Sequence, residues 1–125
     1  MLHSVKNCYS FKELARNIVR DNLTADIRKF NNIIVPILKV KDTNRLMYDS
    51  LRLVLEENDI TYIEEYNTNM KCVLFTDSYI ESLKFYQLFR DEIDKILDKK
   101  NDIMLNEVIN ILKLYEKENI KSKHL

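Results

Sequence analysis

Acidic side chains are the residues of this chain whose type and spacing could most directly do chemistry. Asp91, Asp94 and Asp98 recur at the three- and four-residue intervals that place side chains on one face of a helix. Three carboxylates on one face could hold a divalent cation, because hard cations prefer oxygen ligands. The same spacing is more typical of a solvent-exposed face, with an ion pair between Asp91 and Lys95. We therefore predict no metal site at these residues.

The placement of the histidines and the lack of glycine argue against an enzyme. His3 and His124 lie near opposite ends of the chain and have no HExxH or Cys/His ligand spacing. A serine nucleophile needs a base, and only these two histidines are on offer for that role. The sequence contains no Gly, so it contains neither a P-loop nor a GxGxxG motif. We predict a non-enzymatic protein without catalytic residues and without a cofactor.

Composition and charge favour one folded domain with an uneven surface. The chain has 125 residues, of which 46% are hydrophobic and 32% charged, a balance that supports a folded core. The formal net charge is zero, but residues 1–45 carry +5, residues 46–95 carry −6 and residues 96–125 carry +1. This separation allows a local anionic partner, and it is equally compatible with a solvated surface of mixed charge.

The cysteines and apolar segments indicate an intracellular protein. Cys8 and Cys72 are far apart and lack CxxC spacing, so buried free thiols are expected rather than a disulfide or a metal site. No N-terminal apolar run resembles a signal peptide, and no apolar stretch is long enough to span a bilayer. We expect a cytoplasmic protein that does not engage a membrane. The abundance of Lys, Asn, Ile, Asp and Tyr suggests an AT-rich genome, such as that of a virus, phage or plasmid.

The first half of the chain is predicted to be helical. Ser10 and Glu13 form a capping box, and a helix over residues 11–21 follows, with Leu14, Ala15, Ile18 and Val19 on one face. A second helix is expected over residues 25–34, and a short third helix over 36–39, because proline suits the first turn of a helix. A further helix, capped by Asp42 or Thr43, extends to about Glu57, with Asn58 as its left-handed cap.

The second half predicts a strand hairpin and two helices. Residues 60–66 and 72–76 are rich in β-branched and aromatic side chains, and Asn67, Thr68 and Asn69 between them suit a tight turn. Ser78 and Glu81 form a second capping box at the start of a helix that extends to about Leu97. Asp102 caps a last helix through about Glu118, on which Leu105, Val108, Leu112 and Tyr115 make an apolar seam.

Two runs of residue types in this order match a known pattern. Tyr48, Leu51, Leu55, Glu56, Glu57 and Ile60 give an aromatic residue, leucines and an acidic pair before a short apolar strand, and Thr76 and Asp77 end the second strand of the hairpin. The chain over about residues 23–97 resembles the winged helix-turn-helix regulators of the PadR-like and MarR-like groups. The expected fold class is therefore α+β and helix-rich: a winged helix-turn-helix with a two-stranded hairpin and a C-terminal helical hairpin.

The resemblance implies a single domain of 125 residues with four parts. These are an N-terminal helix (1–22), a winged-helix core (23–77), a helical hairpin that forms a homodimer (78–119) and a frayed tail (120–125). The implied function is a small DNA-binding transcriptional regulator that acts as a dimer on double-stranded DNA. The implied DNA-binding residues are Lys39, Lys41, Asn44, Arg45, Tyr48, Asp49, Arg52, Asn67, Asn69 and Lys71. The implied dimer-interface residues are Tyr79, Leu83, Tyr86, Ile93, Leu105, Val108, Leu112 and Tyr115.

An alternative function is a protein–protein interaction module that binds no nucleic acid, such as a viral or phage inhibitor of a host protein. The chain departs from the regulator pattern because it lacks the usual glycines, is neutral overall, and places Glu64 and Glu65 in a strand of the wing. Phosphates would repel these carboxylates. In the alternative, the acidic middle of the chain or the helical seam would contact another protein.

Overall fold

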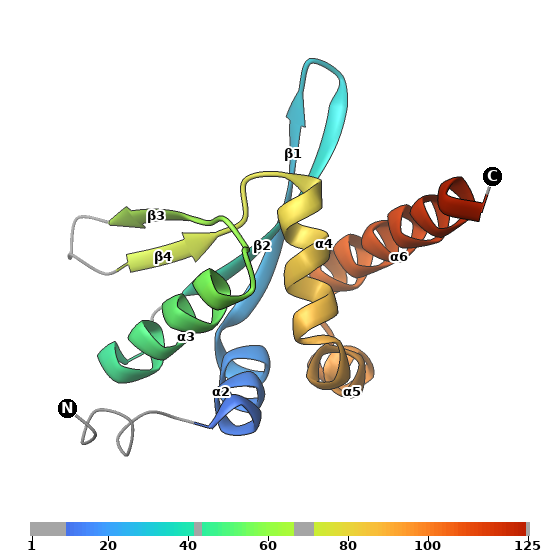
Figure 1. Ribbon diagram of the computed structural model, residues 1–125. Coiled ribbons are helices and arrows are strands. Elements are labelled where there is room, and N and C mark those ends of the chain that lie inside the picture. The colour runs from blue at the N-terminus through green and yellow to red at the C-terminus, as the bar shows by residue number, and fades with distance from the viewer. Residues whose placement is uncertain (1–9, 42–43, 67–71, 125) are drawn as a thin grey trace.

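The computed structural model describes residues 10–41, 44–66 and 72–124, with side chains through Glu118. It is a helix-rich α+β structure, which confirms the predicted class (Figure 1). The elements follow in the order α2 (Phe11–Asn17), the π-helix η1 (Ile18–Asn22), β1 (Leu23–Phe30), β2 (Ile33–Lys41), α3 (Arg45–Glu57), β3 (Ile63–Tyr66), β4 (Cys72–Phe75), α4 (Tyr79–Leu88), α5 (Arg90–Lys100) and α6 (Ile103–His124).

The four strands form one antiparallel sheet in the order β1-β2-β4-β3. Two hairpins, β1–β2 and β3–β4, are joined in the middle where Lys39, Val40 and Lys41 pair with Phe75, Leu74 and Val73. Helix α3 lies between the two hairpins in the chain and packs on the same side of the sheet as α4 (Figure 1). One face of the sheet is therefore covered by helices, as is common for antiparallel sheets.

The first helix agrees with the sequence pattern. The Ser10 hydroxyl accepts a hydrogen bond from the Glu13 backbone N–H at 3.2 Å, as a capping residue should. Its predicted apolar face is buried, with Leu14, Ala15, Ile18 and Val19 at most 2% exposed. The Lys100 ammonium from α5 donates to the carbonyls of Val19 and Leu23, so a cation binds carbonyl groups at the end of this helical segment.

The helices predicted over residues 25–34 and 36–39 are wrong: these residues form the β1–β2 hairpin. Asn31 and Asn32 have φ values of 51° and 67°, and two successive positive φ angles are what a two-residue type I′ hairpin turn needs. Asparagine tolerates this conformation better than other non-glycine residues. The pair therefore reverses the chain in a sequence without glycine, and the helix-turn-helix expected before α3 is absent from these residues.

Pro36 lies in β2 opposite Ile27 of β1, and not in the first turn of a helix as the sequence pattern predicts. It is tolerated because β2 extends beyond the end of β4 at this point, so its neighbour on that side is not a paired strand. Instead, the Pro36 carbonyl accepts a hydrogen bond from the Ser82 hydroxyl of α4 at 2.7 Å. Proline is accepted where a strand has an unpaired edge, since no N–H is then required.

The following helix and hairpin were predicted correctly, with changes at their ends. α3 begins after Asn44, whose side chain accepts from the Met47 N–H at 2.8 Å, whereas the predicted caps Asp42 and Thr43 lie outside the described residues. At the other end the left-handed residue is Asp59, with φ of 56°, and not Asn58, with φ of −104°. The β3–β4 hairpin forms within the two segments that the sequence indicated.

The helix predicted to extend to Leu97 is broken at Phe89, where α4 ends and α5 begins. Phe89 is 1% exposed and its ring lies 4.7 Å from that of Phe85 and stacks on Phe11. The apolar pattern continues through the break, because residues on both sides are buried, so hydrophobic spacing gave no signal of it. Asn101, with φ of 52°, then ends α5, and Asp102 caps α6 through the Leu105 N–H.

A buried relay of hydrogen bonds joins β2, β4 and α4. The Leu38 N–H donates to the Thr76 hydroxyl at 3.1 Å, and the Ser82 hydroxyl donates to the Pro36 carbonyl. Thr76 and Ser82 are also hydrogen-bonded to each other. Because the Ser82 proton is used on Pro36, Thr76 must be the donor in that bond. Both hydroxyls are 0% exposed, so the relay satisfies polar groups that water does not reach.

We predict that Thr76→Val destabilises the protein by about 1–3 kcal/mol, because the buried Leu38 N–H loses its acceptor while the volume is unchanged. The measurement is the free energy of unfolding in urea. Thr24→Val, at a half-buried position of β1, is the matched control and should change this free energy by less than about 0.5 kcal/mol. Equal effects of the two substitutions would contradict the relay.

Glu81 anchors the segment before β3 to α4. Its carboxylate accepts from the backbone N–H of Thr61 at 2.6 Å and from the Thr61 hydroxyl at 2.7 Å, and the Lys84 ammonium lies 3.4 Å away. Burial opposes ionisation, but the Thr61 hydrogen bonds and the Lys84 charge outweigh it, so the pKa of Glu81 is lowered. The ionised carboxylate thus stabilises the folded chain.

A lowered carboxyl pKa gives stability that is present above the unfolded value, near 4.5, and lost as the pH falls through the folded value. We therefore expect Glu81→Gln to lose about 1–3 kcal/mol of unfolding free energy at pH 7, and this difference should shrink below pH 4.5. Denaturant titrations across this range measure it. Glu107→Gln, at an exposed position of α6, should show no such difference; a pH-independent effect at Glu81 would refute the linkage.

Candidate interaction surface

The predicted DNA-reading face of α3 is engaged with the rest of the chain. Arg45 is exposed and forms an ion pair with Asp49 at 3.3 Å. Tyr48 is 8% exposed, and its hydroxyl donates to Glu64 and contacts the Cys72 sulfur. The predicted set is thus split between an exposed ion pair and a half-buried cluster between α3 and the β3–β4 hairpin.

Arg52 belongs to the same cluster. Its Nε donates to the Tyr62 hydroxyl at 3.3 Å and lies 3.8 Å from a Glu64 oxygen. The hydrogen bond with Tyr62 and the charge of Glu64 raise the pKa of Arg52. Burial, followed by the hydrogen bonds with Cys72 and Glu64, raises the pKa of Tyr48. The Tyr48 phenol therefore stays protonated as a structural donor, and Arg52 is committed to a carboxylate of its own chain.

The other predicted DNA contacts are dispersed. Lys39 pairs with Asp26 of β1 at 3.4 Å, Lys41 is exposed at the end of β2, and Asn44 caps α3. Asn67, Asn69 and Lys71 lie outside the described residues. The structure therefore does not bring the described members of the set onto one surface around α3.

The predicted dimer residues lie mostly inside this chain. Six of them are at most 7% exposed in one hydrophobic cluster, namely Leu83, Tyr86, Ile93, Leu105, Val108 and Leu112. The ring of Tyr79 lies 4.7 Å from that of Tyr115, both in the same chain. These six side chains thus pack against the sheet and the neighbouring helices of their own chain. They are not exposed to a second copy.

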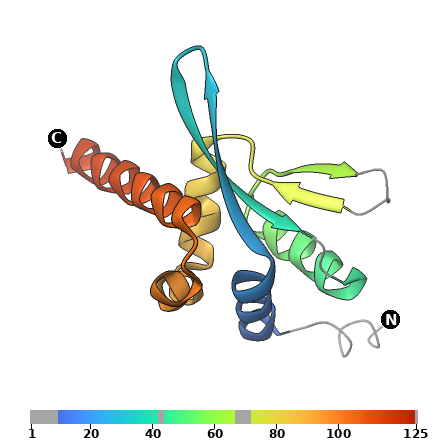
Figure 2. The same ribbon diagram turned by 180° about the vertical axis from the view of Figure 1, so that it is seen from behind.

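The face of the sheet opposite the helices is open. Residues paired across strands point to the same face, and successive residues alternate, so the register places one set of side chains on this face. Seen from that side, no helix lies in front of β2 or β4 (Figure 2). We define the open-face patch as the side chains of Arg28, Phe30, Ile33, Val35, Ile37 and Phe75, which the register puts on this face.

The end of the β1–β2 hairpin projects beyond the helices (Figure 1) and is apolar. Phe30 and Ile33 face each other across the strands and are 71% and 61% exposed. Ile34 on the other face is 45% exposed, and its partner across the strands is Lys29. Single exposed apolar residues are ordinary, but adjacent ones on a projecting element are typical of contact surfaces.

Further along the same face two side chains of the patch are buried. Ile37 and Phe75 are 1% and 2% exposed, and neither belongs to the main core cluster. The Arg28 guanidinium lies over the Phe75 ring, 4.7 Å from its centroid. This is a cation–π contact, and it covers the ring while Arg28 itself stays exposed. The patch therefore has exposed apolar side chains at the hairpin end, an exposed arginine beside them, and buried Ile37 and Phe75 behind the arginine.

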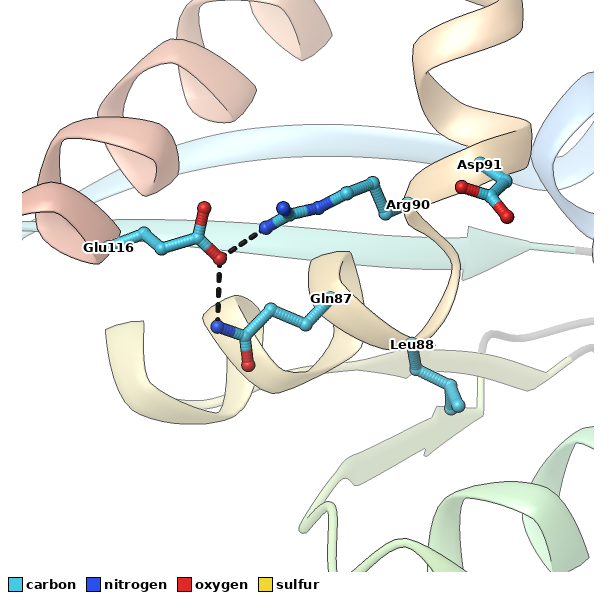
Figure 3. A pocket seen from close by; sticks show the side chains of 5 residues that line it. All are labelled: Gln87, Leu88, Arg90, Asp91 and Glu116. Atoms are coloured by element: carbon cyan, nitrogen blue, oxygen red, sulfur yellow. Dashed lines mark hydrogen bonds and ion pairs between the residues drawn. The ribbon is translucent and has the colours of Figure 1, made fainter. Parts of the chain in front are cut away.

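A second candidate is a polar hollow of about 380 Å³ near the junction of α4, α5 and α6, lined by Gln87, Leu88, Arg90, Asp91 and Glu116. Arg90 and Gln87 both donate to Glu116, while Asp91 stands apart from them (Figure 3). Burial opposes ionisation of Glu116, but the hydrogen bonds from Gln87 and Arg90 outweigh it and lower its pKa. The bonds from Gln87 and Arg90 to Glu116 join α4 and α5 to α6, whereas the buried Arg90 Nε has no hydrogen-bond partner among the described residues. We interpret the hollow as a contact that holds these helices together.

Of the three acidic residues weighed as a cation site, Asp94 has partners within the chain. Asp94 accepts from the Tyr86 hydroxyl at 2.9 Å and lies 3.8 Å from the Lys113 ammonium. Lys95 pairs with Glu92 and not with the predicted Asp91. Within the described part of the chain, no group of three or more His, Cys, Asp or Glu side chains is placed to hold a metal ion. None of the described helices is long and apolar enough to cross a membrane.

No family model, no curated protein and no solved structure matches the chain. The open-face patch therefore rests on geometry alone. Sequence reasoning missed it because residues 25–39 were assigned to helices. The signal that could have found it is the Asn31-Asn32 pair between two runs with strand-like side chains, which is a known hairpin pattern.

The turn can be tested directly. We predict that Asn32→Val lowers the free energy of unfolding by about 1–2 kcal/mol, because a β-branched side chain clashes in the left-handed region. Asn32→Gly should leave it unchanged or raise it, since glycine adopts positive φ without strain. Urea denaturation compares the two variants. If valine is tolerated as well as glycine, the turn conformation is not the one described.

Proposed function

We propose that the protein is a non-enzymatic binding module that docks its open-face patch on another protein. The observation that carries the proposal is the pair of exposed apolar side chains, Phe30 and Ile33, at the end of a projecting hairpin. Burying such a side chain in an interface yields about 1.5–3 kcal/mol. An apolar centre with a charged neighbour, here Arg28 on the same face, is the usual anatomy of a protein interface.

The composition of the patch supports a protein partner over a purely electrostatic one. Aromatic residues and arginines carry most of the binding energy at protein interfaces, and Phe30 and Arg28 lie on the same face of β1. The hairpin is supported at its base by the buried relay through Thr76 and Ser82. A supported element loses less conformational entropy on binding.

The second candidate is the dimeric DNA-binding regulator of the winged-helix type. The observation that favours it is the excess of cations along the β1–β2 hairpin, where Arg28, Lys29 and Lys41 have no ion pair among the described residues. In this case the β1–β2 hairpin, and not α3, would serve as the wing and contact phosphates. The neutral net charge of the chain gives this candidate less support, since DNA-binding domains are usually basic.

The double substitution Phe30→Ser with Ile33→Ser tests the proposal. The protein is immobilised and used to capture partners from the source cells, and captured proteins are then purified and tested for direct binding. We expect the double variant to lose at least roughly tenfold in affinity, about 1.4 kcal/mol or more. Leu53→Ser, which removes an apolar side chain 53% exposed on α3, is the matched control and should bind like the original protein.

Two outcomes would contradict the proposal. One is a purified partner that binds the double variant as tightly as the original protein. The other is that the protein captures no partner through the patch and instead binds a mixed-sequence DNA duplex tightly. This binding should weaken steeply as the salt concentration rises, as phosphate contacts require. The second outcome would favour the DNA-binding regulator.

A further inference from the structure

Arg28 differs from most other arginines of the described residues, since among these only Arg16 also has no ion pair with a carboxylate. Arg45, Arg52 and Arg90 each lie within 4.0 Å of a carboxylate of this chain. Among the described residues Arg28 has no such carboxylate, and its guanidinium carbon lies over the Phe75 ring, 4.7 Å from the centroid. A contact with the face of a ring does not pair the five N–H donors of a guanidinium with a carboxylate, so these donors can still bind an anion.

The surroundings of Arg28 restrict the kind of anion. On the same face of the hairpin Arg28 is opposite Val35, and the next pair toward the tip is Phe30 with Ile33. The nearby acid on this face, Asp26, is paired with Lys39 at 3.4 Å. A partner that covers the apolar tip must also cover the guanidinium, and burying an unpaired charge costs several kcal/mol.

We propose that the partner places a carboxylate against Arg28, beside apolar side chains that cover Phe30 and Ile33. This inference rests on the proposed function and identifies the partner as an acidic, apolar-rich protein segment. A carboxylate accepts two parallel hydrogen bonds from a guanidinium, which fixes its position as well as its charge. Val35, Phe30 and Ile33 give the guanidinium apolar neighbours. A protein segment can cover these apolar side chains, whereas a row of phosphates has no apolar surface to do so.

The test uses two fluorescein-labelled peptides of alternating residues, one of Asp and Leu and the other of Asn and Leu. Fluorescence anisotropy with the full chain at low ionic strength should show the aspartate peptide binding at least roughly tenfold more tightly than the asparagine peptide. Arg28→Gln should remove this preference. Arg20→Gln is the matched control, because Arg20 is exposed and already paired with Asp21, and it should keep the preference. Circular dichroism checks that each variant folds.

The outcomes separate the two proposals. Equal binding of both peptides, lost in the Phe30→Ser with Ile33→Ser variant, would overturn the carboxylate inference and leave the docking surface standing. Aspartate preference that survives in Arg28→Gln would also overturn it. Binding of neither peptide would overturn it too, and the proposed function then depends on the capture experiment alone. A DNA duplex that binds more tightly than the aspartate peptide, and loses affinity in Arg28→Gln, would overturn the inference in favour of phosphate.

Discussion

The hydrogen-bonded relay from Leu38 through Thr76 and Ser82 to Pro36 is the constraint on which the arrangement of the sheet depends. β4 pairs with only three residues of β2, so the next stretch of β2 would leave polar backbone groups buried without partners. The hydroxyls of Thr76 and Ser82 bind the backbone groups of β2 that a longer β4 would pair with. Pro36 has no N–H, so one backbone donor that would need an acceptor is absent. The hairpin can then continue outward as a two-stranded extension.

The relay also explains why α4 lies where it does. Ser82 must stay within hydrogen-bond distance of Pro36, and Glu81, its neighbour, holds Thr61 just before β3. One turn of α4 therefore fixes both hairpins relative to each other. The apolar residues Leu83, Phe85 and Tyr86 of the same helix are buried in the core, so polar and apolar contacts of α4 reinforce a single position.

Sequence reasoning succeeded where a short local signal and the tertiary structure agree. The caps at Ser10 and Ser78 form as expected, and the β3–β4 hairpin follows its β-branched and aromatic residues. It failed at residues 25–39, where Ile27, Phe30 and Ile34 have helical spacing but lie in two strands of a hairpin. Pro36 in the second of these strands depends on a partner 46 residues away. It also failed at Phe89, because a helix break inside a buried stretch leaves the hydrophobic pattern unchanged. The open-face patch was missed because residues 25–39 were predicted to be helical.

The distribution of charge acquires a different meaning in the folded chain. Two acids of the middle third bind groups of their own chain: Glu64 binds Tyr48 and Arg52, and Glu81 binds Thr61. The cations of the first third are divided, with Lys39 held by Asp26 and Arg28 left facing outward on Phe75. A neutral chain can therefore present a locally cationic surface, because Arg28, Lys29 and Lys41 lie on one hairpin and have no ion pair among the described residues. A contact made by such a surface depends on one or two charges and on the apolar residues beside them, and it should be less sensitive to salt than a contact made by a basic stripe.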